Sequence, residues 1–171
     1  MNFKNYNIPL IIVIAIITLT VLMLCSWAYG ELAIKKPLAQ KLVSINGVNH
    51  FEAKNQNGEL IMEVELQSIQ DLKETYTKID KTIADLANKG DLYSISIIDS
   101  PNEKLLAAWE DIQYAAFQAI SNGDFISLHT SIEDSKGFDA NLKYKISIDE
   151  NLLFIQIHDG DYFLYRVLKR S

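Results

Sequence analysis

The chain has 171 residues, enough for one membrane-spanning segment and one compact domain, and it carries a formal net charge of −6. All 22 acidic residues and all but one of the 16 basic residues follow residue 30. This acidic balance excludes a nucleic acid as an expected partner, because phosphate-backbone binding needs clustered Lys and Arg. The single cysteine, Cys25, excludes an intramolecular disulfide.

Residues 8–29 form an apolar run without a charged residue. A helix of this length would extend about 33 Å at about 1.5 Å per residue, enough to cross a hydrocarbon core about 30 Å thick. Trp27 and Tyr29 lie at its end, where aromatic side chains favour the membrane interface. We therefore predict a membrane anchor in residues 1–30, with Trp27 and Tyr29 at the interface and the lipid bilayer as a partner.

Two kinds of processing are alternatives to a retained anchor. Ala28-Tyr29-Gly30 fits the pattern of a signal-peptidase site, but the apolar run exceeds the roughly 7–15 residues of signal-peptide cores. Lipid attachment at Cys25 would need a small preceding residue, and Leu24 stands there. A retained single-pass anchor is the favoured interpretation, and a cleaved signal peptide stays open.

The positive charges on the two sides of the predicted anchor are nearly balanced, so charge alone does not fix its orientation in the membrane. Lys4 and the α-amine precede the anchor, whereas Lys35, Lys36 and Lys41 follow it closely. The short N-terminal tail with its signal-like layout favours an inner N-terminus. We therefore expect a single-pass protein of the cell membrane with an extracytoplasmic domain.

The remainder is expected to divide into a stalk and a domain. Residues 31–47 are predicted to be a juxtamembrane stalk, and residues 48–171 a soluble α+β domain. Pro37 interrupts any continuous helix through the stalk. The apolar spacing over residues 37–45 nevertheless predicts one short helix there.

A β-hairpin is expected at the start of the domain. Residues 48–54 and 59–66 have strand-like composition, and the second run alternates apolar and polar side chains. Asn57-Gly58 between them is a strong signal for a two-residue turn, because both residues tolerate positive φ.

Two helices with a strand between them are predicted next. Ser68 and Asp71 form a Ser-x-x-Asp capping box in front of a helical apolar stripe. Residues 91–99 alternate as a strand. Ser100 is expected to cap the second helix, and Gly123 to end it.

An antiparallel meander is predicted to complete the chain. Four strand-like runs are present: 124–132, 141–148, 151–158 and 161–170. Asp159-Gly160 is expected to form the tight turn of the last hairpin. The predicted fold class is therefore α+β: an N-terminal transmembrane helix followed by one mixed-sheet domain, ordered (α)ββαβα and then an antiparallel β meander.

The first part of the domain has the order helix–strand–strand–helix–strand, with Gly47-Val48 entering the hairpin. This order resembles BON domains and the ring-building modules of secretion and sporulation machineries. The likeness rests on this element order and on the Gly47-Val48 entry to the hairpin, and the trailing helix and meander lie outside it. It implies a packing or assembly role rather than catalysis.

The last hairpin has an unusual second face. Pairing across Asp159-Gly160 places residue 157 opposite residue 162 and puts one set of alternate side chains on an apolar core face. The other face is usually polar in a half-exposed sheet. Here it carries three aromatic residues, Phe154, Phe163 and Tyr165, together with Gln156. Either a helix or the juxtamembrane segment of the same chain covers it, or it is an interaction face for a protein partner or for self-association.

No catalytic residue, metal site or cofactor is predicted. His50, His129 and His158 lie far apart and lack metal-ligand spacing. Ser127 and His129 share one face of a predicted strand, but no nucleophile elbow or orienting acid accompanies them. The glycines are scattered singly and form no phosphate-binding loop.

Two classes of function remain. The first is a membrane-anchored, non-enzymatic interaction domain on the outer side of the cell membrane. The alternative is a tethered small-ligand-binding or sensor domain, whose pocket lies between the helices and the meander and is lined by Tyr144 and Tyr165. An enzyme is third.

Overall fold

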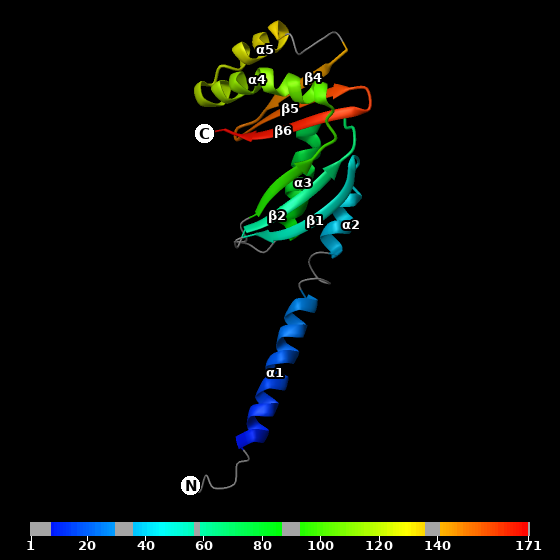
Figure 1. Ribbon diagram of the computed structural model, residues 1–171, viewed down its shortest axis with the longest axis vertical. Helices are drawn as coiled ribbons and strands as arrows, with labels where there is room; N and C mark the ends of the chain where they lie inside the picture. The colour runs from blue at the N-terminus through cyan, green and yellow to red at the C-terminus, as the bar shows by residue number, and fades with distance from the viewer. Residues whose placement is uncertain (1–7, 30–35, 57–58, 87–92, 136–140, 171) are drawn as a thin grey trace.

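The computed structural model describes five stretches of the chain: 8–29, 36–56, 59–86, 93–135 and 141–170. A long helix is followed by an α+β domain (Figure 1), and the predicted fold class is confirmed. The strands are divided between a mixed sheet and a separate antiparallel sheet, each of three strands. The turn predicted at Asn57-Gly58 lies outside the described residues, although the strands on either side of it pair as expected.

The first helix, α1 (Ile8–Tyr29), carries no charged residue. Its threonine hydroxyls donate to carbonyl oxygens one turn earlier, Thr18 to Ile14 and Thr20 to Ile16, each at 2.8 Å. In a hydrocarbon environment such bonds would avoid the cost of an unsatisfied hydroxyl. Within the described part of the chain, α1 is the one helix long and apolar enough to cross a membrane, a character that signal sequences share.

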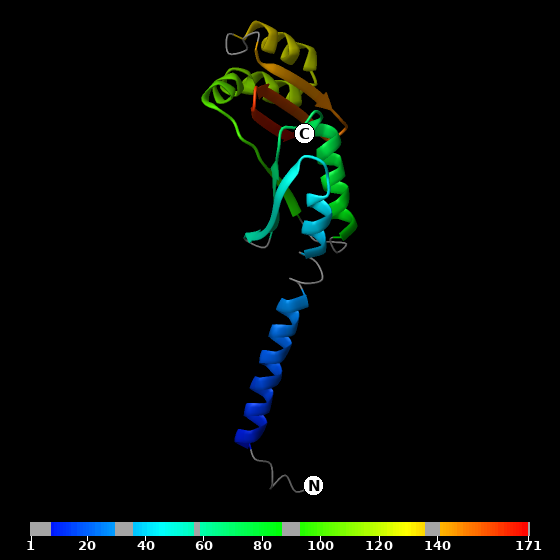
Figure 2. The same cartoon turned by 90° about the vertical axis from the view of Figure 1, so that its right-hand side faces the viewer.

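The first half of the domain has the predicted helix–strand–strand–helix–strand order. Its elements are α2 (Lys36–Val43), β1 (Val48–Gln56), β2 (Glu59–Leu66), α3 (Leu72–Leu86) and β3 (Tyr93–Ile98). The central strand β2 is antiparallel to β1 and parallel to β3. Both helices lie on the same side of this mixed sheet (Figure 2), and alternate β2 side chains are buried beneath them.

The short helix predicted inside the stalk belongs to the folded domain. Leu38 and Leu42 of α2 are buried in the same core as Val64 of β2 and Ile79 of α3. The apolar spacing predicted this helix correctly, but its burial moves the start of the domain from residue 48 to α2.

The two long helices begin later than their predicted caps. Asp71, not Ser68, caps α3, and its Oδ1 accepts from the amide of Glu74 at 2.9 Å. Likewise, Asn102 rather than Ser100 caps the next helix. Ser100 stays extended because its carbonyl accepts from the amide of Phe163, 3.2 Å away on the last strand.

The second half of the domain is a helical layer on an antiparallel sheet. It comprises α4 (Glu103–Asn122), α5 (Phe125–Asp134), β4 (Lys143–Ile148), β5 (Leu152–Asp159) and β6 (Tyr162–Lys169). The sheet order β4-β5-β6 is the predicted meander. One of its faces packs against α4 and α5, which lie at the end of the domain opposite α2 (Figures 1 and 2).

The strand predicted over residues 124–132 was wrong, because this segment is the helix α5. Its alternating pattern also fits a helical period, with Leu128 and Ile132 one turn apart and both buried against α4. The missed signal is the cap: Asp124 Oδ1 accepts from the amide of Ser127 at 3.0 Å.

The register predicted for the last hairpin was also wrong, by two residues. Ile157 pairs with Leu164 instead of residue 162, because the two turn residues are Gly160, with a φ of 60°, and Asp161. A shift of two residues preserves the faces of a strand, so the predicted division of side chains between the two faces is unchanged.

Gly47, between α2 and β1, occupies a position that does not accommodate a side chain. Its φ is 94°, and a Cβ there would lie 2.2 Å from Cγ2 of the buried Ile69. Gly47→Ala is therefore expected to lower the free energy of unfolding by about 2–3 kcal/mol. Gly123→Ala, at a φ of 76° with no atom within 4 Å, should cost only about 1 kcal/mol. Equal costs in denaturant titrations would contradict the close approach.

Candidate functional site

The four residues predicted as an interaction face lie inside the domain. Phe154, Gln156, Phe163 and Tyr165 are all buried, and the side chain of Phe154 is 1% exposed. The ring of Tyr76 on α3 meets that of Phe154 edge-on, with 5.6 Å between centroids. The cover is thus a part of the same chain, which was the first of the two alternatives, and this face is not open to a partner.

The covering segment is the β2–α3 loop, residues 67–71, together with α3. Tyr165 Oη accepts from the amide of Ile69 at 2.9 Å and lies 3.2 Å from the carbonyl of Gln67. Burial raises the pKa of Tyr165 to about 12, so this phenol stays protonated and donates to that carbonyl. These bonds attach the loop to the antiparallel sheet.

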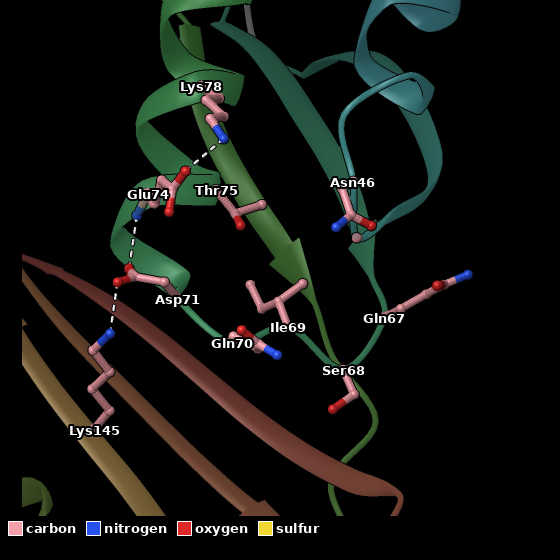
Figure 3. A pocket seen from close by; sticks show the side chains of 11 residues that line it. Asn46, Gln67, Ser68, Ile69, Gln70, Asp71, Glu74, Thr75, Lys78 and Lys145 are labelled. Atoms are coloured by element: carbon pink, nitrogen blue, oxygen red, sulfur yellow. Dashed lines mark hydrogen bonds and ion pairs between the residues drawn. The ribbon is translucent and has the colours of Figure 1, made fainter.

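A cleft remains where the β2–α3 loop meets the edge of the antiparallel sheet. It consists of two adjoining hollows of about 610 and 520 Å³ that share Ser68, Ile69, Gln70 and Lys145. We call it the junction cleft. Figure 3 shows the first hollow, with the loop running below α3 and Lys145 reaching from β4.

The charges in the first hollow neutralise one another. Lys145 Nζ lies 2.6 Å from Asp71 Oδ2, and Lys78 Nζ lies 2.6 Å from Glu74 Oε1 (Figure 3). The hydrogen bond from Lys145, followed by that from the amide of Glu74, lowers the pKa of Asp71. This hollow therefore has no excess of either charge.

A hydrogen-bond chain in the second hollow fixes the tautomer of His158. Gln156 Oε1 accepts from the amide of Leu72 at 2.8 Å, which orients its Nε2 as a donor. That Nε2 lies 3.2 Å from the carbonyl of Gln70 and 3.4 Å from Nε2 of His158. His158 Nε2 must then be an acceptor, so the proton is on Nδ1, which faces Ser68 Oγ at 3.4 Å.

This tautomer decides what the Ser68–His158 pair can do. A general base needs its lone pair, not its proton, toward the serine hydroxyl. Here Nδ1–H donates to Ser68, and no carboxylate is among the contacts of His158 within the described part of the chain. The arrangement holds the β2–α3 loop in place and does not activate a nucleophile.

The free energy of unfolding is expected to depend on pH through His158. Burial, and then the charge of Lys143 on β4, lower the pKa of His158. Protonation would also place an N–H on His158 Nε2 facing the donating Nε2 of Gln156. The neighbouring phenol of Tyr165 stays neutral because its pKa is about 12. Because the unfolded chain then binds a proton more tightly, stability should fall as pH drops below 6.5, the ordinary histidine value. The His158→Gln variant should lose less of its free energy of unfolding than the wild type over the same pH range, as measured by denaturant titration. Equal losses in the two proteins would contradict this prediction.

Of the other candidate residues from the sequence, only Tyr144 lies at this cleft. His50 is exposed on β1, and His129 is exposed on α5, 3.6 Å from Glu133 and 3.5 Å from Tyr144 Oη. Ser127 bonds to the cap of α5, not to His129. Of the two tyrosines expected to line a ligand pocket, Tyr144 lines the second hollow, whereas Tyr165 is buried and is not part of its lining.

Across the described ranges, no group of three or more His, Cys, Asp or Glu side chains could hold a metal ion. Trp27 and Tyr29 lie in the last turn of α1, and their place at a membrane interface stays a prediction.

Comparisons of the chain with models of protein families, with curated proteins and with solved structures found no match. The likeness to BON domains and ring-building modules therefore extends to the observed element order and no further.

Proposed function

We propose that this protein is a single-pass, membrane-anchored, non-enzymatic interaction domain that docks a partner through its helical layer. The observation that carries this proposal is a set of large apolar side chains exposed on α4 and α5, which we call the helical face: Leu106, Tyr114, Phe117 and Ile126. Tyr114 is 79% exposed, Phe117 53% and Ile126 82%. Large apolar side chains exposed on one layer are a feature of many binding surfaces.

α4 and α5, which carry the helical face, belong to the half of the domain that lies farther along the chain from the anchor. Seven chain steps separate Tyr29 from Lys36, so α2 begins within about 25 Å of the end of α1. α4 and α5 form the opposite end of the domain (Figure 1). We therefore propose a protein rather than the anchor's bilayer as the occupant, and with an inner N-terminus this partner is extracytoplasmic.

Charge indicates the chemistry of the partner. Over α4 and α5 the sequence places one ammonium, Lys104, among six carboxylates: Glu103, Glu110, Asp111, Asp124, Glu133 and Asp134. A second copy of the same face would oppose like charges, which is unfavourable. The surface that fits is that of another protein, apolar at its centre and basic at its rim.

Photocrosslinking tests this docking. A photoreactive residue at Gln118, exposed on α4, should give an adduct in native membranes that weakens with salt. Tyr114→Ser with Phe117→Ser should reduce it at least about tenfold, since central aromatic residues dominate binding energies. Ile98→Ser with Tyr162→Ser, which removes exposed apolar groups elsewhere, should leave it unchanged.

Two results of this experiment would reject the helical face as a partner site. One is an adduct consisting of two copies of this chain. The other is an adduct that both double variants form equally, because exposed apolar area alone would then explain it.

A second candidate, a tethered ligand-binding domain, is favoured by the junction cleft. Its second hollow combines Lys143, Lys145 and Tyr144 with the polar side chains of Ser68 and Gln70. The cleft and the helical face occupy different surfaces, so both activities are compatible with one domain.

A further inference from the structure

The second hollow of the junction cleft contains hydrogen-bond donors that the fold does not use. Ser68 Oγ accepts from His158 Nδ1–H, which leaves the hydroxyl proton of Ser68 to be donated elsewhere. Among the described residues, the side chains of Gln70 and Lys143 have no hydrogen-bond or ion-pair partner. All three residues line this hollow.

Charged acceptors are lacking in the same place. The charged residues that line the second hollow are Lys143 and Lys145, and no carboxylate of the described ranges lines it. Asp71, the acid bound to Lys145, is held at 2.6 Å from the Nζ of that lysine and accepts from the amide of Glu74 at 2.9 Å. A chain with a formal net charge of −6 thus has a locally positive hollow.

The walls of this hollow are fixed by buried contacts. Gln156 and Tyr165, both buried, bond the β2–α3 loop to the sheet through Leu72, Gln70 and Ile69. Lys143 lies opposite His158 in the β4–β5 register. Ser68 on the loop and Lys143 on the edge strand therefore both neighbour His158 and line the same hollow.

We propose that the second hollow binds a small oxyanion, the carboxylate or phosphate group of a ligand. Lys143 supplies the charge, and the Ser68 hydroxyl and the Gln70 amide donate hydrogen bonds to the anion's oxygens. The volume of about 520 Å³ lies within the roughly 300–1,000 Å³ typical of small-ligand sites. The amides at the start of α3 take no part, because Asp71 and Gln156 already bond to them.

His158 provides the readout. Its pKa is lowered by burial and by the charge of Lys143, so a bound anion that offsets this charge should raise the pKa of His158. His50 and His129 lie outside the hollow and serve as internal references in the same NMR spectrum. The probes are inorganic phosphate and acetate, added to the full chain in nonionic detergent micelles.

The expected result is a saturable shift of the His158 ring signals with at least one probe. Lys143→Gln should weaken the apparent affinity about tenfold, the loss typical of one charge-assisted hydrogen bond, and Lys143→Arg should retain most of it. Lys81→Gln, which removes an exposed charge from α3, should match the wild type. Ser68→Ala should weaken binding several-fold.

The lipid headgroup and the soluble ligand are distinguished in bilayer nanodiscs. A His158 shift with anionic phospholipid and no added probe identifies a headgroup phosphate, whereas a shift only with free phosphate or acetate identifies a soluble ligand. The site is rejected if neither probe nor anionic lipid gives a saturable shift, or if Lys143→Gln and Lys81→Gln behave alike.

Discussion

Phe154→Ala is expected to lower the free energy of unfolding by about 3–5 kcal/mol, a larger loss than the one expected for Gly47→Ala. The Phe154 ring is 1% exposed and packs between the antiparallel sheet and α3, in the core that also contains Leu72 and Val64. Truncation removes this apolar contact area and leaves a cavity that close-packed neighbours cannot fill. Denaturant titration of the full chain in micelles, followed by circular dichroism, measures the change.

Phe117→Ala is the matched control for this prediction. Phe117 is 53% exposed on α4, so the same truncation there should change the unfolding free energy by no more than about 0.5 kcal/mol. The pair also separates the two faces: Phe154 contributes to folding, and Phe117 is available for docking. A small cost at Phe154 would show that the aromatic face is not buried by α3.

Asp99→Ala is expected to cost about 2–4 kcal/mol by opening the join between the two sheets. Asp99 directly follows β3, and its Oδ2 accepts from the amide of Tyr165 at 2.7 Å and from Arg166 Nη1 at 2.9 Å. The carboxylate is only 12% exposed, so its removal leaves a shielded amide and a guanidinium without their acceptor. The same denaturant titration measures the loss.

An exposed ion pair provides the comparison for Asp99. Lys54 and Glu63 lie 2.6 Å apart on the open face of the mixed sheet, with side chains 47% and 26% exposed. Lys54→Ala should cost clearly less stability than Asp99→Ala, because water screens and replaces such pairs. If the two variants lost equal stability, the Asp99 contacts would not join the sheets in solution.

Most elements of the fold were predictable because their signals are local. The apolar length of α1, the spacing of Leu38 and Leu42, and the glycine ending α4 are features of short stretches of sequence. The exceptions, α5 and the starts of α3 and α4, are places where two local patterns compete. Long-range contacts accompany the shifted starts: Ser68 bonds to His158, and Ser100 bonds to Phe163.

The candidate sites were less predictable, for a physical reason. The sequence identified an aromatic face that had to be covered, but not the β2–α3 loop that covers it. Ser68 and His158 are 90 residues apart, and neither belongs to a local motif that predicts the contact. The helical face was hidden because α5 was interpreted as a strand, which left Ile126 without a helical neighbour.

The sequence by itself determined the anchor-like segment, the α+β class and the identity of the two faces of the last hairpin, because apolar period and turn chemistry act over a few residues. Only the tertiary structure decided that the aromatic face is interior, that α2 belongs to the core and that Ser68, His158 and Lys143 line one hollow. Those outcomes depend on which elements pack together, and packing is settled by the burial of surfaces far apart in the chain.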